Sequence, residues 1–465
     1  MEAVEENKIK RHCPNLIGHD RLFQIEYVLI NVLSWLPVKT LLRFKGVCKQ
    51  WRNLISDDPY FIHLHSQQSK SKQPLLLFSS IPADSRGSNF LKSMDREKNP
   101  ISRFEVKFEN SFTNLLPTRF DLVCIKDDQI VHICNPSTHE YITLPKSHVH
   151  HDYSVVGFGY VQSTDEYKVV RLISPDYSII EEGSIVEVSS FKTKCQVFTL
   201  GMERRGSSSC SSSTSSSWAW RDVVDSPFDV SNSSPPAFVN GAIHWLVMYD
   251  ILLDTDYYNG DLIDSNNTII AFDVESEEFR VVPHPEGCPD LRSFDSSVHQ
   301  LVELRGLLCL SCAIDSKMDI WMLKDYCYES GNDHIVGTWM KEYSIDLNVL
   351  HRSYRLGDNP FRYYAPRDIE DTEVLIETHM KGLGYYHLQS KRFKGFIHSS
   401  RQMPRLRFSF YVESLRSLKQ TISTGIAVVS NFSILNYSVT SSGKHEAQAE
   451  AKAKAESYSL TIINP

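Results

Sequence analysis

The hydrophobic pattern of the 465-residue chain changes its period once, near residue 74. Before that point apolar residues recur at steps of three and four, which is the pitch of an α-helix. Beyond it, short runs alternate apolar and polar positions between turn residues, which is typical of β-strands. We therefore expect an α+β multidomain protein, in which a small N-terminal α-helical domain is followed by a large all-β domain.

The helical pattern is clearest over residues 36–55. Its apolar positions are Leu41, Phe44, Cys48, Trp51 and Ile55. Pro37 suits a first helical turn because it has no N–H to lose there, Gly46 predicts a break, and the Asp-Asp-Pro run at 57–59 ends the pattern. A second apolar stripe covers residues 25–36. A unit of this size has a thin core, so we expect part of its apolar surface to bind a partner. The alternative is a helical cap packed on the following domain.

The β pattern repeats as pairs of hairpins. One kind has a tight turn such as Asn240-Gly241 or Arg305-Gly306, because a type I′ turn needs positive φ at both central residues. In the second kind a polar turn precedes an aromatic residue, as at residues 135–141, 273–279 and 387–393. Two hairpins make a four-stranded unit, and the units recur about every 50 to 70 residues, a period expected of β-propeller blades.

Five such units can be counted, with a sixth built from residues 74–78 and 103–108. The late strand at 408–413 is predicted to return beside this sixth unit, which comes first in the chain, and to leave no open sheet edge. The β domain is therefore expected to be β-propeller-like. The alternative is an irregular β-sandwich or two stacked sheets.

Three motifs of the helical segment, Leu36-Pro37, Arg43-Phe44 and Val47-Cys48-x-x-Trp51, stand in the order and at the spacing of a plant F-box. This part of the chain resembles the F-box proteins. Segments at 156–171 and 238–245, together with Ile320-Trp321-Met322-Leu323, resemble the F-box-associated (FBA, kelch-like) domain. That domain follows the F-box in a plant family that includes the S-locus F-box and F-box/kelch-repeat proteins.

The pattern and the resemblance together give an expected domain organisation. In chain order we expect a disordered N-terminus (1–21), the F-box (22–63), a linker (64–73), the kelch-like β domain (74–415) and a C-terminal tail (416–465), of which residues 443–457 are expected to be solvated. A Ser-rich low-complexity loop occupies residues 206–217 of the β domain.

The resemblance implies a non-catalytic subunit of an SCF (Skp–cullin–F-box) E3 ubiquitin ligase. The F-box would bind the Skp-type adaptor, and through it a cullin–RING ligase, while the β domain recruits a protein for ubiquitination. The residues expected at the adaptor interface or directly behind it are Leu36, Pro37, Leu41, Leu42, Val47 and Trp51. By similarity to the S-locus proteins a pistil ribonuclease is one candidate substrate, and defence signalling or another degradation pathway is equally open.

One departure from the F-box pattern favours a second hypothesis. Gln24-Ile25 stands where the family has Leu-Pro, and Tyr27 replaces an acidic residue. Weakened adaptor binding would leave a ubiquitin-independent β-propeller scaffold. A third hypothesis is an enzyme with a propeller active site, but no G-x-S-x-G, phosphate-loop or H-E-x-x-H motif is evident.

Aromatic residues near the expected blade tips are candidates for a substrate-binding surface, because exposed aromatics are good interface anchors. They are Tyr257, Tyr258, Phe361, Tyr363 and Tyr364.

Metal binding and cofactors are not expected. Cys309-x-x-Cys312 is surrounded by apolar residues, which fits a buried strand better than a zinc site, and no second cysteine pair lies at zinc spacing. The histidines at positions 148, 150 and 151 are interpreted as a solvated loop.

Composition and charge argue against several further classes of protein. A net charge of −8 and a pI near 6.1, without a basic stripe, argue against nucleic-acid binding. No stretch approaches the ~18 apolar residues of a membrane span, and the polar start lacks a signal-peptide core. The ten cysteines lie mostly in apolar runs, as expected of a reducing compartment. We expect a protein of the cytoplasm, the nucleus or both.

Overall fold

The computed structural model describes most of the helical pattern and most of the β pattern. The described residues are 20–80, 88–96, 99–107, 113–127, 130–147, 154–174, 193–201, 218–232, 234–247, 268–288, 299–314, 316–328, 335–350, 364–378, 382–398, 406–421, 430–431 and 433–434. They form two compact units. The helical unit holds the described residues up to 74 and residues 412–416, and the β unit holds 75–411 and the residues from 417 onward.

The described residues of the helical unit form the helices α2 (Asp20–Ser34), α3 (Val38–Phe44), α4 (Lys49–Asp57) and α5 (Pro59–Lys70). The predicted break at Gly46 is confirmed, since a turn separates α3 from α4 there. The predicted end at 57–59 is also confirmed: the Asp58 carboxylate accepts the Phe61 N–H at 3.0 Å and caps the next helix, α5. No helix among the described residues is long and apolar enough to cross a membrane.

The core of the helical unit is small. Its buried apolar residues are Leu33, Val38, Leu41, Ile55, Phe61 and Leu415. Leu415 shows that the chain returns to this unit about 340 residues after leaving it, so residues 412–415, which were predicted to end the β domain, belong to the helical unit.

The predicted linker at 64–73 is wrong over most of its length, because α5 continues to Lys70. His65 is buried and its Nε2 lies 3.1 Å from the carbonyl oxygen of Leu36, and Ser69 is buried as well. The Ser, Gln and Lys residues that suggested a linker occur along a helix whose other face packs inward.

The β unit contains six sheets, listed here by their strands. The first has β24 (Leu406–Tyr411), β1 (Leu75–Ser80), β2 (Ser88–Met94), β3 (Pro100–Lys107) and β26 (Ser433–Ile434); the second has β4 (Thr113–Leu115), β5 (Val123–Asp127), β6 (Ile130–Asn135), β7 (Glu140–Thr143) and β25 (Ser430–Asn431). The third has β8 (Ser154–Val161), β9 (Glu166–Ile173), β10 (Lys194–Leu200) and β11 (Arg221–Asp222); the fourth has β12 (Ala237–Val239), β13 (Ala242–Leu246), β14 (Thr268–Asp273) and β15 (Phe279–Pro283). The fifth has β16 (His299–Leu304), β17 (Leu307–Ile314), β18 (Lys317–Tyr328) and β19 (Ile335–Asp346); the sixth has β20 (Tyr364–Glu370), β21 (Glu373–Thr378), β22 (Gly382–His387) and β23 (Arg392–His398).

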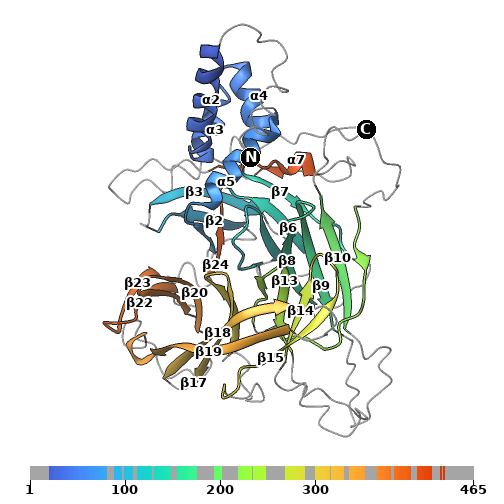
Figure 1. Ribbon diagram of the computed structural model, residues 1–465, viewed down its shortest axis with the longest axis vertical. Coiled ribbons are helices and arrows are strands. Elements are labelled where there is room, and N and C mark those ends of the chain that lie inside the picture. Colours follow the sequence, from blue (N-terminus) through green and yellow to red (C-terminus); the bar gives the residue numbers. More distant parts are fainter. Residues whose placement is uncertain are drawn as a thin grey trace. The chain divides into compact units, whose positions relative to one another are not determined.

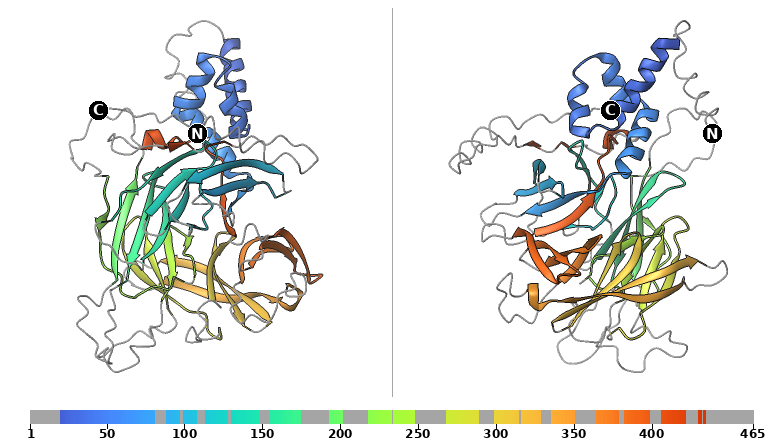
Figure 2. Two further views of the ribbon diagram at one scale, coloured as in Figure 1. Left: turned by 180° about the vertical axis from the view of Figure 1, so that it is seen from behind. Right: turned by 60° about the vertical axis from the view of Figure 1, so that its left-hand side comes forward.

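These sheets are the blades of a six-bladed β-propeller (Figures 1 and 2). The predicted ring closure is confirmed: β24 pairs antiparallel with β1, with Phe408 opposite Phe78. Contacts between β8 and β12, β12 and β16, β16 and β20, and β24 and β4 identify the inner strands of the blades. The first blade is thus built from both ends of the β unit, which removes an exposed inner edge.

Turn geometry explains the repeated sequence signature. Asn240 and Gly241 have φ of 50° and 77°, and Arg305 and Gly306 have 55° and 77°, as the predicted type I′ turns require. In the second kind of hairpin the fifth residue of the turn has positive φ each time: His139 at 60°, Glu277 at 60° and Lys391 at 53°. The side chain of the first turn residue accepts a following backbone N–H, as Asn135 Oδ1 does from Ser137 at 2.8 Å.

The first part of the predicted C-terminal tail packs on the β unit. The short helix α7 (Leu418–Thr421) packs on the second blade through the buried Leu418, whose N–H donates to the Glu140 carboxylate at 2.8 Å. Residues 435–465, the Ser-rich loop at 206–217 and residues 1–19 lie outside the described part of the chain.

Candidate functional site

The helical unit carries an exposed apolar row along α2 and its end. Val28, Val32 and Trp35 are 58, 56 and 53% exposed, and their spacing of four and three places them on one helix face. Tyr27 beside them is also exposed, and Val47, in the turn between α3 and α4, is 62% exposed. Large exposed apolar side chains on one helix face are a candidate surface for binding another protein. We call these five residues the exposed apolar set.

The residues predicted for adaptor binding fall into two groups. Pro37 and Val47 are exposed, whereas Leu41 is fully buried in the core. The other three, Leu36, Leu42 and Trp51, are half-buried and pack against that core. Leu41 therefore supports the surface from behind, and Val47 is the one predicted residue that also belongs to the exposed apolar set.

Sequence reasoning missed most of the exposed apolar set. The signal was present: apolar residues occupy positions 27–30, 32, 33, 35 and 36, too many for a single buried helix face. A helix that is apolar on two sides buries one of them in its own unit, as Leu33 is buried, and leaves the other for a partner.

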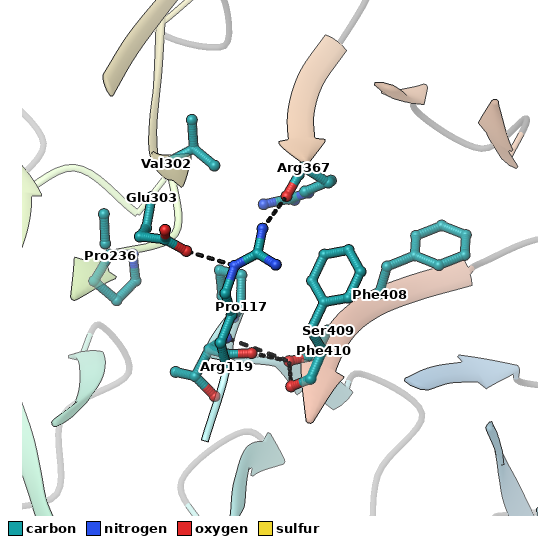
Figure 3. Close-up of a pocket in the computed structure, with 11 residues that line it drawn as sticks. Pro117, Arg119, Pro236, Val302, Glu303, Arg367, Phe408, Ser409 and Phe410 are labelled. Atoms are coloured by element: carbon teal, nitrogen blue, oxygen red, sulfur yellow. Dashed lines mark hydrogen bonds and ion pairs between the residues drawn. The ribbon is translucent and has the colours of Figure 1, made fainter. Parts of the chain in front are cut away.

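The β unit has a small cavity where inner strands of its blades meet (Figure 3). It is lined by Pro117, Thr118, Arg119, Pro236, Ala237, Val302, Glu303, Arg367, Phe408, Ser409 and Phe410. Its volume of about 20 Å³ is room for roughly one water molecule. The residues that line this cavity therefore leave no room in it for a larger ligand.

Arg119 links blades across this cavity. Its guanidinium donates to Glu303 at 2.6 Å and lies 4.6 Å from the centre of the Phe410 ring (Figure 3). It also donates to Asp368 at 2.8 Å. Burial lowers the pKa of Arg119, but the two carboxylates more than offset this and leave it raised. Arg96 also pairs with Asp368. The carboxylates here are occupied by arginines, which is the chemistry of structural cross-links between blades.

The predicted substrate-binding aromatics are not placed on a surface by the structure. Tyr257, Tyr258, Phe361 and Tyr363 lie outside the described residues. Tyr364 is 3% exposed and packs in the core cluster of the fifth and sixth blades, so the expectation of an exposed aromatic is wrong for this residue. As the first residue of β20 it alternates into the blade core instead of facing solvent.

Comparison with family models decides the family. The F-box domain model matches residues 26–63, and the F-box associated beta propeller domain model matches residues 68–335, more than half of the chain. The chain belongs to the F-box-associated β-propeller family. The helical unit thus contains the F-box, and the exposed apolar set lies within the matched residues.

Curated plant F-box proteins are similar to this F-box propeller protein over most of its length. F-box protein At3g07870 of Arabidopsis thaliana is 25% identical over 80% of this chain and 87% of its own length. F-box protein At5g49610 of the same plant is 28% identical over 70% of this chain and 79% of its own. The F-box/kelch-repeat protein At3g23880, also from Arabidopsis, is 23% identical over 78% and 87%. The predicted resemblance is confirmed.

Proposed function

We propose that this F-box propeller protein is the substrate-recognition subunit of an SCF E3 ubiquitin ligase. In this proposal the helical unit binds a Skp-type adaptor, and the β unit recruits the protein to be ubiquitinated. The observation that carries it is the exposed apolar set, in a segment that matches the F-box domain.

Docking of an adaptor would cover side chains that the small unit leaves in water. Burying a large apolar side chain contributes roughly 1.5–3 kcal/mol, and Trp is among the residues that most often dominate an interface. Trp35, with Val28 and Val32 on the same face of α2, is therefore the expected anchor.

The chain would supply no catalytic group itself. By holding a target protein near the ubiquitin-charged enzyme, it raises the effective concentration of the target's lysines, and proximity accelerates the transfer. We place this activity in the cytoplasm, the nucleus or both.

Co-purification of the full chain with a plant Skp-type adaptor tests the proposal. The wild type should retain the adaptor, and Val32→Asp combined with Trp35→Ala should lose it. Val224→Asp is the matched control, since Val224 is 67% exposed but lies in the β unit. If the wild type retains no adaptor while its β-sheet circular dichroism is intact, the ubiquitin-independent scaffold is the better account.

A further inference from the structure

Two histidines and two cysteines lie near one another where the chain runs from the fourth blade to the fifth. His284 and Cys288 follow β15, His299 opens β16, and Cys312 lies in β17. A side-chain ligand atom from each of His284, Cys288 and His299 lies within 4.8 Å of the others. Cys312 is the register partner of His299 in the antiparallel pair β16–β17, so its side chain lies next to this cluster.

Local backbone structure brings these residues together. The chain turns after β15: the Cys288 N–H donates to the Pro285 carbonyl at 3.2 Å, and Gly287 has a φ of 77° that favours glycine. His299 and Cys312 are directly opposite partners in the antiparallel pair β16–β17, so their side chains lie on the same face of the sheet.

We propose that His284, Cys288, His299 and Cys312 form a structural Zn²⁺ site. Two thiolates and two imidazoles are a ligand set that proteins use for tetrahedral zinc. Zn–S bonds of about 2.3 Å and Zn–N bonds of about 2.0–2.1 Å place tetrahedral donors about 3.3–3.8 Å apart. The three donor atoms that lie within 4.8 Å of one another therefore need to approach by no more than about 1.5 Å.

Charged groups also lie near the cluster. Asp319 of β18 is the register partner of Cys312. Its carboxylate pairs with Lys317 at 3.2 Å and with Lys341 at 3.3 Å, so the negative charge that would hold a cation comes from the two thiolates. Cys309 of the Cys309-x-x-Cys312 motif is not a ligand, because it lies three positions away on the opposite face and packs in the blade core.

The site would join neighbouring blades. Two ligands come from the end of the fourth blade and two from the fifth, so a bound ion would tie together strands that the chain connects only through residues 289–298. Binding energy of a structural metal is also folding energy. Zinc would thus stabilise the propeller independently of adaptor binding by the helical unit.

Metal content of the full-length protein tests this site. The chain is purified under reducing conditions, equilibrated with Zn²⁺, passed over a desalting column and analysed by elemental mass spectrometry. One zinc per chain is expected. Titration with Co²⁺ should give the visible absorption of a tetrahedral thiolate complex, and zinc should displace it.

Variants at the two half-exposed ligands, Cys288→Ser and His284→Gln, should weaken zinc binding at least about ten-fold in competition with a chromophoric chelator. Cys327→Ser, at an exposed cysteine outside the cluster, and Cys309→Ala should bind zinc like the wild type. Circular dichroism checks that each variant is folded. Equal zinc binding by the ligand variants and the wild type, or a Cys288–Cys312 disulfide in place of metal under these conditions, would overturn the proposal.

Discussion

Lys72 Nζ donates a hydrogen bond of 2.8 Å to the carbonyl oxygen of Trp35 and lies 5.8 Å from the centre of its indole ring. The lysine follows α5 and the tryptophan follows α2, so the contact fixes the end of α2 against the rest of the helical unit. It holds an exposed aromatic side chain in one orientation before a partner arrives, and such preorganisation lowers the entropy cost of binding.

Removing this support should weaken adaptor binding without unfolding the unit. An exposed cation–π contact is worth about 0.5–1 kcal/mol, so Lys72→Ala should raise the Kd for a Skp-type adaptor by about two- to five-fold. Calorimetry measures this change. Lys194→Ala, which removes the same charge from an exposed position in β10, is the control and should leave the Kd unchanged.

Substitutions at Leu41 and Val47 should affect different properties, the first the stability of the helical unit and the second its binding of the adaptor. Leu41 is fully buried, so Leu41→Ala should lower the free energy of unfolding of the helical unit by about 2–5 kcal/mol. Val47 is exposed, and Val47→Ser should change stability by less than about 0.5 kcal/mol while weakening adaptor binding. Denaturant unfolding and calorimetry on both variants test this division. A strongly destabilised Val47→Ser variant would contradict the placement of Val47.

The returning segment 412–416 should make the helical unit sensitive to pH. Burial raises the pKa of the Glu413 carboxyl, and the opposing effects of Lys72 and the Val38 N–H do not cancel this. Since the folded state holds the proton more tightly, its contribution to stability is present below the ordinary pKa of about 4.5 and is lost as pH rises through the folded pKa.

Glu413→Gln, which keeps a neutral acceptor, should remove this dependence. Amide hydrogen exchange in α3, expressed as protection factors near pH 4.5 and pH 7, measures it. The wild type should lose protection at the higher pH and the variant should not. Equal pH profiles for the two proteins would show that Glu413 is not the group responsible.

Replacing Arg119 should lower the stability of the propeller and leave that of the F-box unchanged. Arg119→Met leaves Glu303 and Asp368 without this cation in a largely buried setting, and we expect the β unit to lose up to about 3–5 kcal/mol of stability. Arg221, which is 54% exposed, pairs with Glu277 on the surface, and Arg221→Ala should cost no more than about 1 kcal/mol. Thermal unfolding followed by circular dichroism compares the two.

The sequence predicted local backbone geometry better than contacts between residues that lie far apart in the chain. Asn240-Gly241 indicates its backbone angles through residue type, and the polar turn before Phe279 indicates a hairpin, so hairpins, blades and ring closure were predictable. The helices α5 and α7 were not predicted to pack inward, because most of their side chains are polar. Each still buries a side chain that composition does not reveal, Ser69 in α5 and Leu418 in α7.

Sites formed by distant residues were not predictable. His284 and His299 are not at a recognisable metal-ligand spacing, and Cys312 suggested a pair with Cys309 that strand alternation rules out. The members of the exposed apolar set in and next to α2 were missed for another reason: a periodic pattern shows that a face is apolar but does not tell which of two apolar faces is buried.

Titration calorimetry of the full chain with a purified plant Skp-type adaptor tests the central claim most directly. The account predicts a Kd in the micromolar range or tighter, weakened at least about ten-fold by Val32→Asp or Trp35→Ala and unchanged by the β-unit control Val224→Asp. A folded wild-type protein with no measurable heat of binding, or equal affinity in all four proteins, would contradict it.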